Sequence, residues 1–439
     1  MTEQDTVRTG RLPALSTVGC CLWLATAALA QEPGGDGLFQ QGRDALFLGR
    51  YPDAIELLQQ AVATDRDGTK TAWRLYLAKA YRYAGQDTEA EPLLRQILTV
   101  SPDHVEAGQA LAEIHAADED WQAILDVLEP LLKYRHDYPT YHLLAEAAYN
   151  LNLAPRARGY YQQAVALNPA SAVDHYQLGN LYLQENSFAL AADSFRTALR
   201  LGLDSPVLHY KLASAYFNLR NYFGRIEQVE VKAGKAGSIH RDRFLIEPVP
   251  GRTDVFLTAP VASAIYQVTK AIDGGLDDRA DIHVLRANIY LNAQRFAQAH
   301  ALFAAIEKTV PEADQALFYY YFAQAAFGID AFDDYLRLLG EAIQRDPEAY
   351  RPNLVVAYQK VAEHYNQTGQ LDRYIEYLGK AVAESPRTAA LHLELGNAYQ
   401  ENRDHAAAVV QWRMVLDLEP DHPQRTELLN SIERWSDGG

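Results

Sequence analysis

The sequence predicts an all-α fold in which about ten helix hairpins stack into a solenoid, with a C-terminal capping helix and one small β-rich insertion. The first observation behind this prediction is an apolar residue that closes the second helix of each hairpin and returns about every 34 residues. The second is that each unit contains two stretches of apolar residues at helical spacing, with turn residues between them. Because a single hairpin cannot bury its apolar face alone, such units must stack on one another.

The repeat can be followed along the whole chain by its closing residue. The closing positions are Ala61, Ile97, Leu131, Ala164, Ala198, Ala271, Ile306, Ala342, Ala381 and Val415. Many units then stop at a proline, which cannot continue a helix. These prolines are Pro102, Pro169, Pro311, Pro347, Pro386 and Pro420. We expect each hairpin to turn near a Gly, Asn or Asp.

Two segments repeat one skeleton of residue types. Residues 391–420 contain Leu395-Gly396, Tyr399, Ala408, Trp412 and Pro420, and residues 175–201 contain Leu178-Gly179, Tyr182, Ala191, Phe195 and Ala198. This skeleton resembles the tetratricopeptide-repeat (TPR) family, in its exported bacterial type, over about residues 35 to 421. The resemblance implies a right-handed α-solenoid that holds other molecules.

The N-terminal stretch predicts export. Residues 12–30 are apolar, follow Arg8 and Arg11, and end in Ala28-Leu29-Ala30, which is typical of a signal-peptidase site. We expect cleavage near Ala30 and a periplasmic or secreted mature chain with no membrane span. Retention of this stretch as an N-terminal membrane anchor is the alternative, and a lipoprotein is a third interpretation.

The repeat positions divide the chain into segments. After the signal peptide (1–30) and a flexible leader (31–37), residues 38–220 hold repeats 1 to 5 and the first helix of repeat 6. An insertion occupies 221–258, and residues 259–421 hold the second helix of repeat 6 and repeats 7 to 10. Residues 422–439 are predicted to form the capping helix and a tail.

The insertion is inferred from the doubled interval between Ala198 and Ala271. It contains runs rich in β-branched residues and a Pro-Gly turn, which predict a small β element. Its basic residues stand out in an acidic protein and favour a partner-docking role; they are Lys235, His240, Arg241 and Arg243. A loop without a binding role and a catalytic element are the alternatives.

The resemblance also implies which residues line a binding groove, because the first helix of each TPR hairpin faces the concave surface. The matching positions are Tyr76, Lys79, Arg82, Tyr83, His142, Tyr149, Asn150, Tyr176, Asn180, Tyr210, Lys211, Asn218, Asn288, Tyr320 and Tyr321. Tyrosine and asparagine combine apolar area with donors and acceptors, which suits a protein or peptide partner, with a polysaccharide as the alternative. Each of these residues has a second interpretation as part of the packing between helices. The lysine that opens the family's carboxylate clamp has no counterpart at the matching positions, so recognition of chaperone tails is not expected.

Composition excludes several other functions. The formal charge of −17 opposes binding to nucleic acid. The only two cysteines lie in the N-terminal apolar stretch, and no phosphate-binding loop or metal-binding motif occurs, so we expect no catalytic residue, cofactor or metal and no enzymatic activity. The sequence therefore predicts an exported protein-interaction scaffold. An accessory protein for glycan handling or exopolysaccharide secretion in the cell envelope is the alternative, and an enzyme that uses the insertion is a third.

Overall fold

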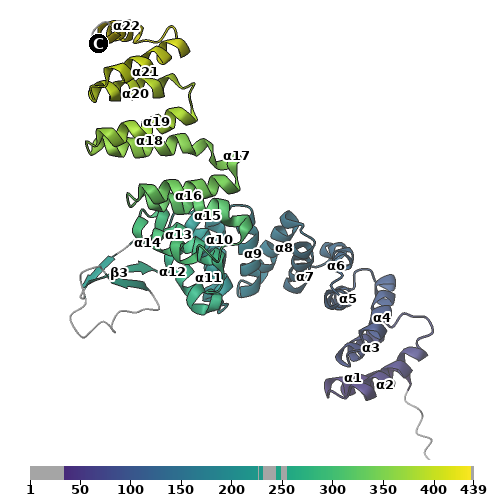
Figure 1. Cartoon of the computed structure of the whole chain (residues 1–439). Coiled ribbons are helices and arrows are strands. Elements are labelled where there is room, and N and C mark those ends of the chain that lie inside the picture. The colour runs from purple at the N-terminus through teal and green to yellow at the C-terminus, as the bar shows by residue number, and fades with distance from the viewer. Residues whose placement is uncertain (1–33, 226, 231–243, 249–254, 437–439) are drawn as a thin grey trace, which may run out of the picture. The chain divides into compact units, whose positions relative to one another are not determined.

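The computed structural model describes residues 34–225, 227–230, 244–248 and 255–436. Helices follow one another along nearly the whole chain (Figure 1). The chain divides into two compact units, Met1–Tyr160 and Tyr161–Gly439, which are described separately.

The first unit contains the first seven helices and the start of an eighth. They are α1 (Gly35–Phe47), α2 (Tyr51–Thr64), α3 (Thr71–Tyr83), α4 (Asp87–Val100), α5 (Val105–Ala117), α6 (Trp121–Leu128), α7 (Tyr138–Asn150) and α8 (Ala154–Leu167). A 3-10 turn, Glu129–Lys133, follows α6 directly. Because α1 begins at Gly35, the end of the expected leader 31–37 belongs to the first helix.

The second unit contains the remaining helices. They are α9 (Ala172–Gln184), α10 (Phe188–Arg200), α11 (Pro206–Asn218), α12 (Ala264–Ala271), α13 (Ala280–Asn292), α14 (Phe296–Ile306), α15 (Gln315–Phe327), α16 (Phe332–Arg345), α17 (Pro347–Tyr350), α18 (Pro352–Gln367), α19 (Leu371–Glu384), α20 (Ala389–Glu401), α21 (His405–Leu418) and α22 (Arg425–Ser436).

The prediction of an α-solenoid of about ten hairpins is confirmed. In the described residues, the hairpins are α1/α2, α3/α4, α5/α6, α7/α8, α9/α10, α11/α12, α13/α14, α15/α16, α18/α19 and α20/α21. The last helix, α22, packs on α21 through Leu428 and Ile432, which join the apolar cluster around Trp412.

Every closing position is buried, which explains why its residue type repeats. Ala61, Ile97 and Ala381 have no exposed surface. Leu131 is also buried but lies in the 3-10 turn and not in α6. Pro130 explains the difference, because its nitrogen cannot donate the hydrogen bond that would continue the α-helix.

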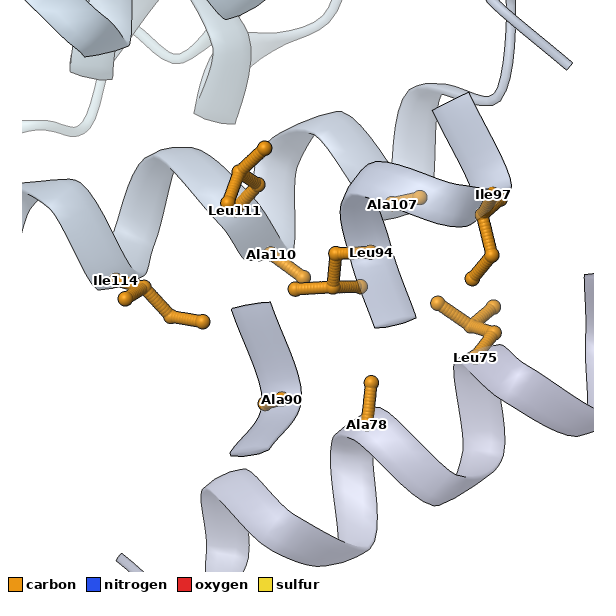
Figure 2. Packing of buried hydrophobic residues seen from close by; sticks show 9 residues of the cluster. All are labelled: Leu75, Ala78, Ala90, Leu94, Ile97, Ala107, Ala110, Leu111 and Ile114. Carbon is orange, nitrogen blue, oxygen red and sulfur yellow. The ribbon is translucent and has the colours of Figure 1, made fainter. Parts of the chain in front are cut away.

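One cluster in the first unit shows how neighbouring hairpins share a core. Side chains of α3, α4 and α5 point into a single space, with Leu94 in its middle (Figure 2). Leu75 and Ala78 come from α3, while Ala110 and Leu111 come from α5 of the next hairpin. The second helix of one hairpin therefore buries its apolar face between two first helices.

The glycine of the family skeleton is required by close packing within a hairpin. A Cβ atom on Gly179 would lie 2.6 Å from the ring of Phe195, and one on Gly396 would lie 2.6 Å from the ring of Trp412. Each glycine lies on the first helix and each ring on the second. The glycine and the aromatic residue of the skeleton therefore recur because they fit together sterically between the two helices of a hairpin.

The left-handed position of the hairpin turns accepts residue types other than Gly, Asn and Asp. Several turns contain a residue with φ near +57° to +59° although it is not Gly, Asn or Asp; these are Glu119, Arg220, Gln294 and Arg403. Each of these turns still has an Asn or Asp within two residues, namely Asp118, Asn221, Asn292 and Asn402, so the expectation that the hairpins turn near such a residue holds. The short connection requires one left-handed residue whatever its side chain, and hairpin packing outweighs the modest backbone strain.

Three strands lie between α11 and α12: β1 (Glu227–Glu230), β2 (Phe244–Pro248) and β3 (Val255–Pro260). They form an antiparallel sheet in the order β1-β3-β2, with Glu227 opposite Thr258 and Ile246 opposite the same Thr258. The basic residues singled out in the sequence, Lys235, His240, Arg241 and Arg243, lie outside the described residues.

The hairpin that carries these strands is closed at their base. Asn221 donates a hydrogen bond from its side chain to the carbonyl of Ala262 (2.6 Å) and accepts one from the backbone N–H of Ala264 (2.9 Å). The backbone N–H of Ile265 donates to the carbonyl of Tyr222 (3.0 Å). These hydrogen bonds join the end of α11 to the start of α12 at the base of the strands.

Among the residues that the structure describes, no helix combines the length and the apolar composition that a membrane crossing requires.

Candidate functional site

The candidate site is built from the first helices of the hairpins. Two clefts lie between successive first helices, one between α3 and α5 in the first unit and one between α13 and α15 in the second. They contain residues that the sequence analysis singled out: Lys79, Arg82 and Tyr83 in the first, and Asn288 and Tyr321 in the second.

The α3–α5 cleft, of about 370 Å³, is lined mainly by charged and polar side chains. Lys79 lies 2.5 Å from the carboxylate of Glu106, and Arg82 lies 2.6 Å from that of Glu113. Gln109 donates hydrogen bonds to the side chains of Asp137 and Thr140. Since each cation here faces a carboxylate of the next first helix, the cleft neutralises its own positive charge.

The α13–α15 cleft, of about 540 Å³, has an apolar floor. Val284 of α13, Leu317 and Phe318 of α15, and Val310 and Pro311 of the intervening loop form it. Phe318 is buried, and its ring packs edge-to-face on Phe303 at 5.5 Å. The floor is therefore continuous with the core at Phe318, whereas Leu317 is 49% exposed.

The mouth of the α13–α15 cleft carries an ordered polar cluster. Both side-chain oxygens of Asp281 accept hydrogen bonds from Arg279, at 2.6 and 3.1 Å, and the Tyr210 hydroxyl donates to the same carboxylate. The Arg279 guanidinium lies over the Tyr210 ring, 5.2 Å from its centroid. The cluster ties α11 to the start of α13.

The same contacts shift the acidity of both groups. Burial raises the pKa of Tyr210 to about 12, and the charge of Asp281 adds to the shift. Burial also raises the pKa of the Asp281 carboxyl, but the hydrogen bonds from Arg279 and Tyr210 outweigh it and hold that pKa below its ordinary value of 3.8. The pair is therefore a neutral phenol donating to an ionised carboxylate at neutral pH.

Asn288 is a polar residue of this cleft whose side-chain oxygen lacks a hydrogen bond within the described part of the chain. Its side-chain oxygen is shielded from solvent and has no partner among the described residues. A shielded amide oxygen without a donor is destabilising, so a native protein normally supplies one from water or a ligand.

A third group of predicted residues lies together on α9 and α11. The Lys211 ammonium donates to the side-chain oxygen of Asn180 at 2.7 Å and lies over the ring of Tyr176, 5.2 Å from its centroid. The ring of Tyr176 also packs on Phe195 at 5.9 Å. These three side chains satisfy one another and pack between helices.

Two predicted asparagines serve the ends of their own helices. Asn150 and Asn218 are the last residues of α7 and α11, and each donates its side-chain N–H to the carbonyl four residues earlier. Asn292, at the end of α13, does the same toward Asn288. The recurrence of asparagine in the first helices is thus explained in part by helix ends that need a donor.

The remaining predicted residues take part in aromatic contacts. Tyr76 packs on Phe39 at 5.4 Å, and His142 stacks on Tyr138 at 5.6 Å. Tyr320 contacts the rings of Tyr321 at 5.9 Å and Tyr350 at 5.1 Å. Tyr149 is half-buried and has an interaction partner within the protein.

The sequence analysis missed the residues that give the α13–α15 cleft its character. Val284 and Asp281 lie four and seven residues before Asn288, and Leu317 lies four residues before Tyr321. Residues at these separations share one face of a helix. Extending each predicted position along its helix face would have found them.

A further cleft, of about 530 Å³, lies at the sixth hairpin and contains none of the predicted groove residues. His209 contributes to it and bonds the side chains of Asp204 at 2.8 Å and Gln267 at 2.5 Å. Gln267 in turn donates to the carbonyl of Val261. These bonds hold α11 and α12 together next to the strands.

No group of His, Cys, Asp and Glu side chains with the geometry of a metal site occurs within the described ranges.

Comparison with known proteins identifies the repeat. Family profiles described as tetratricopeptide repeat match residues 45–114 and 176–222. The human protein O-mannosyl-transferase TMTC1 is 27% identical over 172 residues, which are 38% of this chain and 19% of that protein. The TPR repeat-containing protein YpiA of Bacillus subtilis (strain 168) is 27% identical over 101 residues, 23% of each chain.

One relative matches almost the whole chain. The cellulose synthase operon protein C of Pseudomonas fluorescens (strain SBW25) is 21% identical over 458 aligned positions, covering 91% of this chain and 35% of that protein. The chain thus spans about a third or less of the length of these curated relatives.

Solved structures match part of the chain. YrrB, described as a TPR protein with an unusual peptide-binding site, is 18% identical with a TM-score of 0.36, over 50% of this chain and 92% of YrrB. MamA of AMB-1 is 23% identical with a TM-score of 0.34, over 37% of this chain and 96% of MamA. From the repeat skeleton, the hairpins and the matched profiles, the chain belongs to the tetratricopeptide-repeat family.

Proposed function

We propose that this protein is an exported scaffold that binds a partner protein through the first-helix face of its repeats. The observation that carries the proposal is the α13–α15 cleft, an apolar hollow between two successive first helices. Hollows of this size with an apolar lining and a few polar groups are typical of binding sites. The proposal assigns no catalytic step to the protein.

Site-specific photo-crosslinking tests the scaffold function. A photoreactive phenylalanine analogue replaces Tyr321 in the α13–α15 cleft and, in a separate variant, Val410 on the second helix α21, where the side chain is exposed. We expect a defined protein adduct from position 321 in cells of the source organism and none from position 410. Equal adducts from both positions, or none from position 321, would contradict the proposal.

The insertion is proposed as a second docking element, on the basis of the basic residues noted in its sequence. Because Asn221 and Ala262 close the hairpin at the base of the strands, residues 226–258 can be replaced by a two-glycine linker. We expect the helical circular dichroism signal and the unfolding temperature to stay close to the original while partner adducts weaken. Unchanged adducts would remove the docking role of the insertion.

Export follows, in this proposal, from the predicted signal peptide. N-terminal sequencing of the protein purified from the cell envelope is expected to begin at Gln31. A chain that retains residues 1–30 in the membrane fraction would support the N-terminal anchor instead.

A glycan-handling role is the second candidate, and the match of almost the whole chain to the cellulose synthase operon protein C favours it. Tyrosine rings stack on sugars, and the half-buried rings of Tyr320 and Tyr350 lie 5.1 Å apart. Calorimetric titration with oligosaccharides of β-linked glucose is the test. Binding that is lost in Tyr320→Ala would support the glycan role, and the absence of heat would remove it.

A further inference from the structure

We propose that the α13–α15 cleft binds an extended peptide segment in which a large apolar side chain is adjacent to a lysine or arginine. This inference rests on the proposed scaffold function and specifies the chemistry of the partner at that site.

The floor of the cleft selects an apolar side chain. Val284 and Leu317 present apolar surface from two helices next to the buried Phe318, and Leu317 is 49% exposed in the absence of a partner. Covering this surface removes apolar area from water, which is the main favourable term in association. The volume of about 540 Å³ accommodates one large side chain together with its flanking backbone.

Asn288 selects a peptide backbone. Its side-chain oxygen, shielded and without a partner among the described residues, is placed to accept a hydrogen bond from the bound molecule. A backbone N–H supplies it, whereas a lipid tail cannot. A peptide group carries both a donor and an acceptor, so it satisfies the Asn288 amide in either of its two orientations.

The charges at the cleft mouth select a neighbouring basic residue. The guanidinium of Arg279 is already occupied by the carboxylate of Asp281. Asp314, at the other end of the cleft, is exposed, and no described residue pairs with its carboxylate. The mouth therefore retains a negative charge, in a protein whose formal charge is −17.

The test uses the full chain and a defined probe. The probe is a fluorescein-labelled nonapeptide with both ends capped and a central Phe-Arg pair in a Gly/Ser background, titrated by fluorescence anisotropy. Matched peptides carry Ala-Arg or Phe-Glu at the centre. We expect the Ala-Arg peptide to bind about 10-fold or more weakly, because it lacks the buried ring. The Phe-Glu peptide is expected to bind several-fold more weakly.

Variants of the protein locate the binding. Leu317→Asp is expected to weaken the Phe-Arg probe about 10-fold, while Leu190→Asp on α10, a leucine that is 50% exposed, should leave it unchanged. Asp314→Lys should invert the preference for Phe-Arg over Phe-Glu. Asn288→Ala should weaken all binding peptides alike, since it removes a backbone contact. Circular dichroism of each variant shows that the fold is retained.

Three outcomes would overturn the inference. They are no binding of the Phe-Arg probe at about 1 mM, binding that survives Leu317→Asp, and displacement of the probe by a β-linked glucose hexasaccharide. Photo-crosslinking from position 321 is independent of these results. Protein adducts without the peptide preference would leave the scaffold function standing and reject only the peptide chemistry.

Discussion

The clefts between α3 and α5 and between α13 and α15 share one backbone arrangement and differ in chemistry. Glu106 and Leu317 both lie six residues before a fully buried alanine, Ala112 in α5 and Ala323 in α15. One position thus carries a carboxylate in the first unit and an exposed leucine in the second. The equivalent of Tyr321, two residues before the same alanine, is Ala110.

These substitutions turn one cleft into a set of internal ion pairs and the other into an apolar hollow. Glu106 pairs with Lys79 and Glu113 pairs with Arg82, so both cations of the α3–α5 cleft already face a carboxylate. The apolar side chain of Leu317 forms no such ion pair, and it stays exposed. The repeat period therefore dictates where groove positions fall, while the residues at those positions decide which repeat can bind.

The largest expected effect concerns the floor of the second cleft. Phe318 occupies the register that Ala107 occupies in α5, five residues before the buried alanine, and it packs on Phe303 and Phe322. Phe318→Ala should lower the free energy of unfolding by about 3–5 kcal/mol because it leaves a cavity. Urea unfolding followed by circular dichroism measures the loss. The matched change Leu190→Ala, at an exposed site, should cost about 0.5 kcal/mol or less. Similar losses in the two variants would show that the floor is not continuous with the core.

The polar cluster of the second cleft predicts a pH window. Tyr210→Phe removes the hydrogen bond to Asp281, which should cost about 1 kcal/mol at neutral pH, since the carboxylate is partly exposed. The folded pKa of Asp281 is lowered, so its contribution is present above 3.8 and is lost as the pH falls through the folded value. The pKa of Tyr210 is raised from 10.0 to about 12, so its contribution is present below pH 10.0 and is lost as the pH rises toward 12.

The measurement is the difference in unfolding free energy between the original protein and Tyr210→Phe across that pH range. It should be largest between about pH 5 and 9 and shrink at both ends. A difference that does not change with pH would mean that the Tyr210 hydroxyl and the Asp281 carboxylate do not interact.

The smallest expected effect belongs to the first cleft. Lys79→Met removes the ion pair with Glu106, and because Glu106 is exposed the loss should be about 0.2–1 kcal/mol at low salt. It should nearly vanish in about 1 M salt, where screening is strong. Leu317→Ala in the other cleft should show no comparable salt dependence. A salt-independent cost of Lys79→Met would indicate that packing of the lysine stem outweighs its charge.

Much of the fold can be predicted from local sequence patterns. Prolines such as Pro102, Pro169 and Pro420 each follow a helix end by two residues, as their missing N–H requires. Glycine is required at positions 179 and 396 because the neighbouring aromatic rings leave no room for a Cβ atom. The turns near Asp118 and Asn221 lie where they were expected, but the sequence did not show that the neighbouring Glu119 and Arg220 take the left-handed conformation.

The candidate site was predicted in part. The first-helix positions Lys79, Asn288 and Tyr321 do line clefts, but the sequence could not say which of them are already occupied. Lys79 meets Glu106 from the next hairpin, 27 residues away, whereas the side-chain oxygen of Asn288 has no partner among the described residues. Such pairing depends on the distance between helices of different repeats, which no local pattern contains.

By itself, the sequence determined the number of hairpins, the buried face of each helix and the closing positions. These features follow from the spacing of apolar residues, because each helix must bury one face against its neighbours in the chain. Only the tertiary structure decided that Glu106 neutralises Lys79 while Leu317 and Asn288 stay open to a partner. That outcome depends on which side chains of successive repeats come within bonding distance, a property of the packed hairpins and not of any one helix.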